Sequence, residues 1–276
     1  MPRYDLHSHS TWSDGLLAPA AVVQRAAARG VDVYALTDHD DTGGLAEAAA
    51  AARDTTMTFV PGAELSVTWE SHTIHVVALQ IDPDNAVLNE GLAVIRSGRD
   101  ARAHRIAKSL GDAGIPGAYD GARKFVTSDR LISRSHFARF LVERGHAREM
   151  KDVFKRYLTP GKPGYVTHAW ATLPQAVSWI HAAGGQAVLA HPGRYKVTAT
   201  GMRRLLTDFC EAGGDGIEVL SSSHTPAQFT EYATYARVFG LLASSGSDYH
   251  GPGESWLDLG GLPALPAGVT PVWERW

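Results

Sequence analysis

Short apolar segments recur along the chain, and most of them carry polar residues of the types that bind metals towards their carboxyl ends. They span residues 31–40, 58–67, 74–81, 184–192, 216–222 and 240–250. Alanine-rich stretches such as 18–30 and 43–54 lie between several of them and predict helices, with Gly30 placed to end the first. Alternating strands and helices predict an α/β fold with a parallel sheet. Polar residues at the carboxyl ends of strands are typical of the active site of a β/α barrel.

Residues 91–160 depart from this alternation, because they consist of successive helical segments. We expect an inserted helical lobe at 91–160 and a barrel formed by residues 1–90 and 161–276. The Pro/Gly-rich segment 158–166 is expected to lead back to the barrel, and the tail 263–276 is expected to be a surface loop.

Charge is distributed unevenly between these parts. Residues 96–162 hold 16 Lys/Arg and 7 Asp/Glu, a net charge of +9, whereas the remainder carries −12. A basic insert indicates an anionic ligand such as phosphate or nucleic acid, and a solvated helical face is the alternative.

The overall composition limits the class of protein. With 276 residues and 44% hydrophobic residues, the chain can form one large domain or a domain with a lobe. No apolar run approaches the ~20 residues that span a bilayer, so we expect no membrane association. No signal segment is apparent at the N-terminus, and the single cysteine, Cys210, rules out internal disulfides. These features predict a cytoplasmic protein.

Metal-ligand residue types collect at the predicted strand ends. His7 and His9 are two residues apart and therefore point to the same side of an extended segment. The full set is His7, His9, Asp14, His39, Glu64, His75, His191, Asp248 and His250. A lone histidine at a strand end is usually structural, but the whole set favours divalent Zn, Mn or Fe. One ion takes three or four protein ligands, so nine predict two or three ions, which suit displacement at phosphorus by a metal-bound hydroxide.

The lobe carries arginines at spacings that share one helix face. Arg99, Arg102 and Arg105 are three residues apart, and Arg134 lies near the start of the next predicted helix. Arginine binds phosphate oxygens through two parallel hydrogen bonds. We therefore hypothesise that the lobe covers the metal site and holds a phosphate that is not removed. Surface salt bridges are the alternative for each single arginine.

Several motifs resemble those of the PHP (polymerase and histidinol phosphatase) domain family of amidohydrolase-like barrels. They are DLHSHSTWSDG, ALTDHD, GAELS, AHPGRY, GIEVLSSSHT and GSDYHG. The basic lobe and its segment ISRSHFARFLVERG are similar to the subfamily of 3′,5′-nucleoside bisphosphate phosphatases, which includes enzymes described as 5′-to-3′ exoribonucleases. The resemblance implies a distorted (β/α)7 barrel with an inserted lobe and a trinuclear site, commonly with manganese.

The resemblance also implies how the ligands are shared. The first ion would be held by His7, His9 and Asp248, the second by Glu64 as a bridge with His75 and His191, and the third by Asp14, His39 and His250. The implied catalytic residues are Glu64, Asp248 and Arg134. The implied substrate-binding residues are Asp14, Arg99, Arg102, Arg134, Ser135, His136, Lys162, Arg194 and His224.

The function expected from these observations is hydrolysis of the 3′-phosphate of 3′,5′-bisphosphonucleosides. A 5′-to-3′ exonuclease acting on short RNA or DNA could use the same site. Histidinol phosphatase requires recognition of a cationic amine, which a basic lobe does not favour. Amide or lactone hydrolysis is disfavoured by the same charge, and a non-enzymatic metal-binding module is disfavoured by the number of ligands. Short oligonucleotides are therefore possible partners besides the small nucleotide. Glu218 ends a predicted strand at the same rim, where it could pair with a lobe arginine or orient a ligand.

Overall fold

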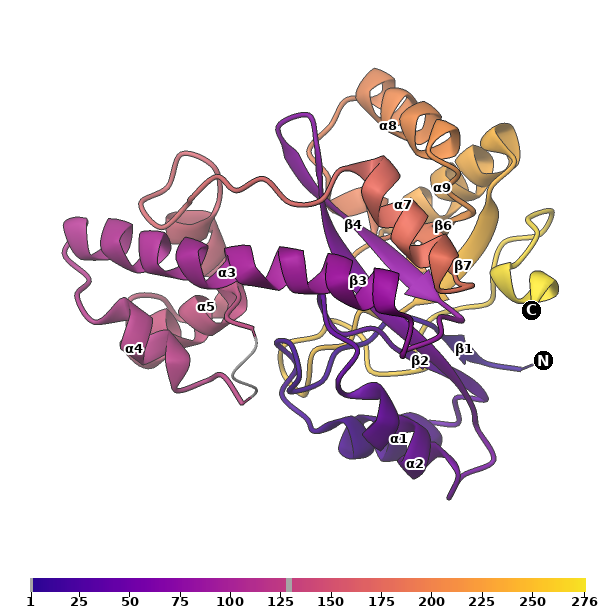
Figure 1. Cartoon of the computed structure of the whole chain (residues 1–276), viewed down its shortest axis with the longest axis horizontal. Helices are drawn as coiled ribbons and strands as arrows, with labels where there is room; N and C mark the ends of the chain where they lie inside the picture. The colour runs from indigo at the N-terminus through magenta and orange to yellow at the C-terminus, as the bar shows by residue number, and fades with distance from the viewer. Residues whose placement is uncertain (1, 128–130) are drawn as a thin grey trace.

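Seven strands form one sheet whose order follows the chain. A computed structural model describes residues 2–127 and 131–276; residue 1 and residues 128–130 of the expected barrel and lobe lie outside the described part. The strands are β1 (Tyr4–Asp5), β2 (Val33–Leu36), β3 (Thr58–Trp69), β4 (His72–Leu79), β5 (Gln186–Leu189), β6 (Gly216–Ser221) and β7 (Leu242–Gly246). The amide of Leu6 donates to the carbonyl of Ser245 at 2.9 Å, which brings the end of β1 against β7. The sheet therefore curls into a nearly closed barrel (Figure 1).

The fourth strand runs opposite to its neighbours. Strand β4 pairs antiparallel with both β3 and β5, whereas the other neighbouring strands pair parallel. Only Glu70 and Ser71 separate β3 from β4, too few residues for the crossover that a parallel pair requires. The prediction that residues 74–81 form a parallel strand was therefore wrong. The reversal places His75 opposite Ser66, two residues beyond Glu64.

Five helices cover the outside of the barrel. They are α1 (Pro19–Ala28), α2 (Leu45–Ala52), α7 (Leu173–Ala182), α8 (Ala199–Glu211) and α9 (Pro226–Phe239). Helix α7 shows why they dock: Leu173, Ala176, Val177 and Ile180 recur along one face, and all are buried. The predicted helices at 18–30 and 43–54 are confirmed as α1 and α2, and Gly30 follows α1 with a φ of +73°. No helix in the described ranges combines the length and apolar character needed to cross a bilayer.

One long helix connects the barrel to the lobe. Helix α3 (Ala86–Asp112) contributes Leu88 and Leu92 to the barrel's hydrophobic core and Ile106 and Leu110 to a separate core in the lobe. The lobe continues with α4 (Ala118–Arg123), α5 (Arg134–Glu143), α6 (Met150–Val153) and a π-helical turn, Phe154–Leu158. Figure 1 shows the lobe projecting beside the barrel. The predicted boundary at residue 91 lies within α3, so the lobe has no flexible linker at this point.

The C-terminal tail is more ordered than the sequence suggests. Pro271 bridges to Ala243 of β7, Val272 is fully buried, and the ring of Trp273 stacks on Tyr4 with centroids 3.6 Å apart. The expectation of a surface loop at 263–276 was therefore wrong for these residues. Their side chains cover the end of the barrel where β1 and β7 begin.

The chain around β7 comes so close to the end of β1 that residue 246 has no room for a side chain. A Cβ there would lie 2.3 Å from the Cβ of His7. We expect Gly246→Ala to lower the free energy of unfolding by about 1–3 kcal/mol, the usual scale of overpacking, in urea denaturation. Gly111→Ala is the control, because a Cβ at this helical position meets nothing within 4 Å and should not destabilise. Equal stabilities of the two variants would contradict the close approach.

Candidate active site

All nine predicted metal ligands converge at one end of the barrel. His7 and His9 follow β1, Asp14 lies in the next loop, and His39 follows β2. Nitrogen and oxygen atoms of the nine form four overlapping groups in which every atom lies within 4.8 Å of the others. The groups are His9, Asp14, His39 and His250; His7, His9 and Asp248; His7, Glu64 and His191; and His39, Glu64 and His75.

The carboxylate of Glu64 lies at the centre of this cluster. Its Oε1 atom lies 2.8 Å from Nδ1 of His75 and 2.8 Å from Nε2 of His191. Its Oε2 atom lies 2.8 Å from Nδ1 of His39. A carboxylate with imidazoles on both oxygens has the geometry of a bridging ligand.

A second carboxylate lies beside the two histidines that follow β1. The Oδ1 atom of Asp248 is 3.1 Å from Nε2 of His9 and 3.5 Å from Nε2 of His7. Asp14 lies further along, with Oδ1 3.4 Å from Nε2 of His250 and 3.8 Å from Nε2 of His39. The first and third implied sets each lie within one group, whereas the second set is divided between two groups that share Glu64.

Burial favours the metal-binding protonation states of several of these groups. It lowers the pKa of His9 and of His191 to about 3, which leaves both imidazoles neutral at pH 7. Burial alone would raise the pKa of Glu64, but the neighbouring imidazoles of His39 and His75 hold it well below its usual range. These groups therefore present neutral nitrogen and anionic oxygen. The neighbouring carboxylates have the opposite effect on His7 and His250: against the effect of burial, they raise the pKa of His7 well above its usual range, and that of His250 to about 9.

Buried oxygen atoms without hydrogen bonds show that a cation fits here. Oδ1 of Asp14, Oε2 of Glu64 and Oδ2 of Asp248 are all buried and accept no well-aligned hydrogen bond from the described residues. Their close nitrogen neighbours are ion-pair contacts with His250, His39 and Arg194, respectively. A buried carboxylate oxygen left without a donor is costly. The chemistry of these donors, imidazole with carboxylate, suits a divalent transition metal.

Three carboxylates outside the ligand set bind either the ligands themselves or the segments beside them. Glu218 lies 2.7 Å from Nδ1 of His7 through Oε1, and its Oε2 accepts from the amide of His191. Asp38 accepts from the hydroxyl of Ser10 at 2.6 Å, and Asp40 accepts from the amide of Ser66 at 2.7 Å. For Glu218 the sequence left open pairing with a lobe arginine or orienting a ligand, and its contact is with His7. Asp38 and Asp40, both in the motif TDHD, were given no role of this kind. Such outer partners fix the orientation and tautomer of ligating histidines.

Backbone strain is concentrated at the same end of the barrel. Asp40, His191 and Asp248 have φ values of 50°, 26° and 55°, a region that non-glycine residues rarely adopt. Each residue is a predicted ligand or lies next to one. Such strain persists only where surrounding contacts fix the conformation, and it is typical of functional sites.

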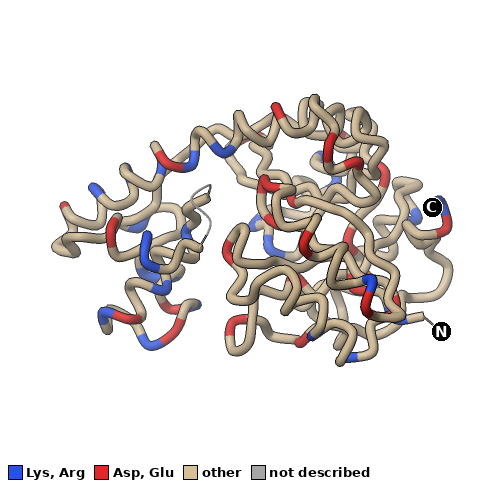
Figure 2. Tube along the Cα trace, turned by 60° about the horizontal axis from the view of Figure 1, so that its bottom comes forward, with Lys and Arg blue, Asp and Glu red and all other residues tan. Residues whose placement is uncertain are grey.

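A cavity of about 150 Å³ adjoins the cluster and is lined by four arginines. They are Arg99, Arg102, Arg134 and Arg194. The predicted ligands Asp14, His39, His75 and His250 also line it, together with Ser135. Figure 2 shows basic positions spread over the lobe and acidic ones over the barrel. The cavity therefore lies where the two charge distributions meet.

Two of these arginines lack a carboxylate partner among the described residues. Arg102 donates to the carbonyl of Val166 at 3.4 Å, and Arg134 donates to the carbonyl of Leu158 at 3.5 Å. Burial, together with the charge of Arg134, lowers the pKa of Arg102 to about 9. Burial also lowers the pKa of Arg134. Two adjacent buried cations without a counterion favour an anion between them.

The other two arginines are paired with carboxylates. Arg99 donates through Nε to Asp40 at 2.8 Å, and its guanidinium lies 4.8 Å above the ring of Trp170. Arg194 reaches the cluster directly, with Nη2 2.5 Å from Oδ2 of Asp248. Arg99 thus links the lobe helix to the barrel, whereas Arg194 competes with any ion for Asp248.

Three predicted substrate-binding residues do not line this cavity. Lys162 is exposed on the connection back to the barrel, in a turn where its amide donates to the carbonyl of Thr159 at 3.0 Å. Nδ1 of His136 accepts from the amide of Ser133 at 3.0 Å and completes a cap on α5. Both ring nitrogens of His224 are engaged within 3.1 Å, by the amide of Gly193 and the carbonyl of Val219.

The start of α5 is fastened to the Asp14 loop by contacts that the sequence did not suggest. Ser133, which caps the helix, donates to Oδ2 of Asp14 at 3.0 Å. Arg139 donates to the carbonyl of Asp14 and forms two 2.8 Å hydrogen bonds with Glu254. These contacts place Arg134 over the predicted metal cluster.

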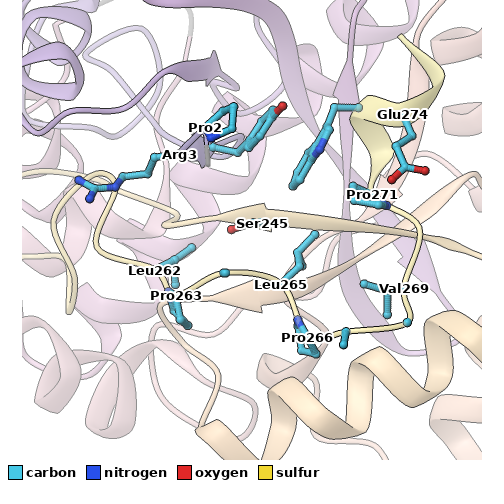
Figure 3. A pocket seen from close by; sticks show the side chains of 15 residues that line it. Pro2, Arg3, Ser245, Leu262, Pro263, Leu265, Pro266, Val269, Pro271 and Glu274 are labelled. Atoms are coloured by element: carbon cyan, nitrogen blue, oxygen red, sulfur yellow. The ribbon is translucent and has the colours of Figure 1, made fainter.

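A larger cavity lies where β1 and β7 begin and has a different character. Its volume is about 560 Å³, and Figure 3 shows Leu262, Pro263, Leu265 and Pro266 around it. Of the residues that line it, only Arg3 and Glu274 carry charge at neutral pH. It contains none of the four ligand groups, so the chemistry points to the smaller cavity.

Comparisons with known proteins agree with this geometry. Residues 5–159 match the family model of the PHP domain. The 3′,5′-nucleoside bisphosphate phosphatase of Chromobacterium violaceum is 52% identical over 275 residues, covering 100% of this chain and 96% of that protein. The 5′-3′ exoribonuclease Rnm of Escherichia coli is 46% identical, covering 99% and 93%. A solved structure of an amidohydrolase from C. violaceum, with bound sulfate and no metal, superposes with a TM-score of 0.96 at 52% identity, covering 99% and 95%. The chain belongs to the PHP domain family.

Proposed function

We propose that the chain is a metal-dependent phosphoesterase that removes the 3′-phosphate of 3′,5′-bisphosphonucleosides, for example converting adenosine 3′,5′-bisphosphate to AMP and phosphate. One observation carries the proposal: predicted metal ligands and the unpaired cations Arg102 and Arg134 line the same cavity. A substrate with two phosphates satisfies both groups, whereas a monophosphate leaves one without an anion. The Chromobacterium relative, which is named for this activity, supports the assignment.

The proposed cofactor is two or three divalent ions, with Mn²⁺ as the expected metal. His7, His9 and Asp248 would hold one ion, and Asp14, His39 and His250 another. Glu64 would bridge the first to an ion held with His75 and His191. When bound, such ions supply an activated water and neutralise charge on the phosphoryl oxygens.

The chain's own side chains would bind and orient the substrate. Arg134 and Arg102 would hold the 5′-phosphate that is retained, while Glu64 and Asp248 would fix the position of the cofactor. Residues 91–160 would act as a lid that covers the site and excludes water, held over the barrel of residues 1–90 and 161–276. The cytoplasmic location predicted from the single cysteine belongs to the same proposal.

A 5′-to-3′ exonuclease is the second candidate, and one observation favours it. Two further cavities share lining residues with the central one, Thr73 on one side and Ser135 on the other. A chain that continues beyond the 3′-phosphate would have room to leave the site. The Escherichia coli relative is named for this activity.

We call the proposed binding of the 5′-phosphate by Arg102 and Arg134 the phosphate grip. It predicts that Arg134→Ala affects substrates with two phosphates more than substrates with one. Losing charge-assisted hydrogen bonds worth about 1.5–3 kcal/mol should lower kcat/KM for adenosine 3′,5′-bisphosphate about 10- to 100-fold. Hydrolysis of p-nitrophenyl phosphate, which lacks the second phosphate, should change far less. Arg144→Ala, exposed just after the same helix, is the control. Equal losses on both substrates would contradict the grip.

The outer carboxylate of Glu218 predicts an effect on metal binding. Glu218→Gln removes the charge beside His7 while keeping the side-chain shape. We expect about 10- to 100-fold weaker Mn²⁺ binding, the usual effect of losing such a partner, measured by competition with a chelating dye. Glu231→Gln on the exposed face of α9 is the control. Unchanged Mn²⁺ binding by the Glu218 variant would show that this carboxylate has only a structural role.

A further inference from the structure

The central cavity is too small for a whole nucleotide. Its volume of about 150 Å³ is roughly half the lower end of the 300–1,000 Å³ that small-molecule sites usually occupy. It already contains the arginines and the predicted metal ligands that would take the two phosphates. The nucleobase must therefore lie in a neighbouring space. Two cavities adjoin the centre, of about 400 Å³ and about 390 Å³.

One of these cavities has an aromatic wall. Trp256, in the loop after β7, and Phe154 with Met150, from the lobe, line the cavity of about 390 Å³. Arg194 and His250 line both this cavity and the central one, so the two are continuous. A flat aromatic surface next to a phosphate grip suits a nucleobase, because every base has a face that stacks.

Trp256 is unusual for a tryptophan because most of its side chain is exposed to solvent. Its side chain is 79% exposed, although tryptophan is a strongly apolar residue that gains by burial. The ammonium of Lys151 lies over its ring, with Nζ 5.5 Å from the ring centroid. Lys151 belongs to the lobe, so the indole faces the gap between lobe and barrel.

Arg134, which would bind the 5′-phosphate, lies close enough to the aromatic ring of Phe154 for one nucleotide to contact both. The guanidinium of Arg134 lies 5.8 Å from the centroid of the Phe154 ring. Arg134 faces the central cavity, and Phe154 lines both cavities. A nucleotide whose 5′-phosphate binds Arg134 would thus extend its base past Phe154 toward Trp256.

We propose that Trp256 and Phe154 form the base-binding subsite, in which the nucleobase stacks on the indole of Trp256. This inference rests on the proposed function, since it names where the substrate's base binds. The subsite selects ligands that carry a base over sugar bisphosphates that lack one. It discriminates weakly among bases, because stacking is tolerant of base identity.

The opposite cavity also has an aromatic ring in its wall, Tyr165, but its other contacts make it less suited to a base. Its wall includes Arg105 and His168, which contact each other at 3.3 Å, and the ring of His168 packs edge-on against Trp170. Trp170 is itself covered by the guanidinium groups of Arg99 and Arg102. These contacts favour phosphate oxygens over a flat ring.

The test compares ligands with and without a base. We expect Trp256→Ala to lower kcat/KM for adenosine 3′,5′-bisphosphate about 10-fold or more, on the scale of one base–aromatic stack. Hydrolysis of 1-deoxyribose 3,5-bisphosphate, which has no base, should stay within about twofold. Trp256→Phe should recover most of the loss. Trp276→Ala, a variant of another exposed tryptophan far from the site, should affect neither substrate.

A binding measurement separates this inference from the proposed function. In calorimetry without added metal, Trp256→Ala should weaken AMP binding about 10-fold and leave ribose 5-phosphate binding unchanged. Equal effects on ligands with and without a base, or no effect on either, would overturn the subsite. Loss of AMP binding in His168→Ala but not in Trp256→Ala would place the base in the opposite cavity and overturn it as well. A wild-type protein that binds AMP through Trp256 yet releases no phosphate would refute only the proposed function.

Discussion

The buried carboxylate of Glu64 is the feature on which the rest of the site depends. It is fully buried, and imidazoles from three other parts of the chain, those of His39, His75 and His191, each lie 2.8 Å from one of its oxygens. A buried charge is tolerated only beside compensating groups, and these imidazoles compensate it in part. Divalent cations shared among the surrounding ligands would complete the compensation. The strained backbone at His191 and Asp248 is consistent with a barrel end built around this requirement.

The site has two halves, the predicted metal ligands of the barrel and the arginines of the lobe. They bind charges of opposite sign, and the fold connects them rigidly. The buried carboxylates of the barrel cluster favour bound cations, and the unpaired arginines of the lobe favour a bound anion. Helix α3 belongs to both hydrophobic cores, and Arg99 on that helix is paired with Asp40 beside the cluster. Ser133 joins the start of α5 to Asp14. A substrate with two phosphates would therefore sit between parts whose spacing the fold fixes.

Much of the site could be predicted from the sequence because the ends of parallel strands meet at one edge. That rule brought His7 and Asp248 together without knowledge of the packing. Glu64, expected at a strand end, instead lies inside β3, beyond the part that pairs parallel with β2. The direction of β4 was not predicted, because periodicity is the same in both directions and a two-residue turn decides it. The outer partners Glu218 and Arg139 were missed or left unassigned, since their contacts join positions far apart in the chain. Residue type suggested a substrate role for His136 and His224, but local partners that only the fold reveals occupy their ring nitrogens.

The most direct test of the account is phosphate release by the Mn²⁺-loaded wild-type protein from four substrates side by side. These are adenosine 3′,5′-bisphosphate, AMP, adenosine 3′-monophosphate and a short 5′-phosphorylated RNA. The account predicts fast release from the bisphosphate and slow release from both monophosphates, because only the bisphosphate satisfies the metal cluster and the arginines together. Equal rates for the bisphosphate and the 3′-monophosphate would contradict the grip on a second phosphate. Degradation of the RNA with the bisphosphate left intact would make the protein a nuclease and the substrate assignment wrong.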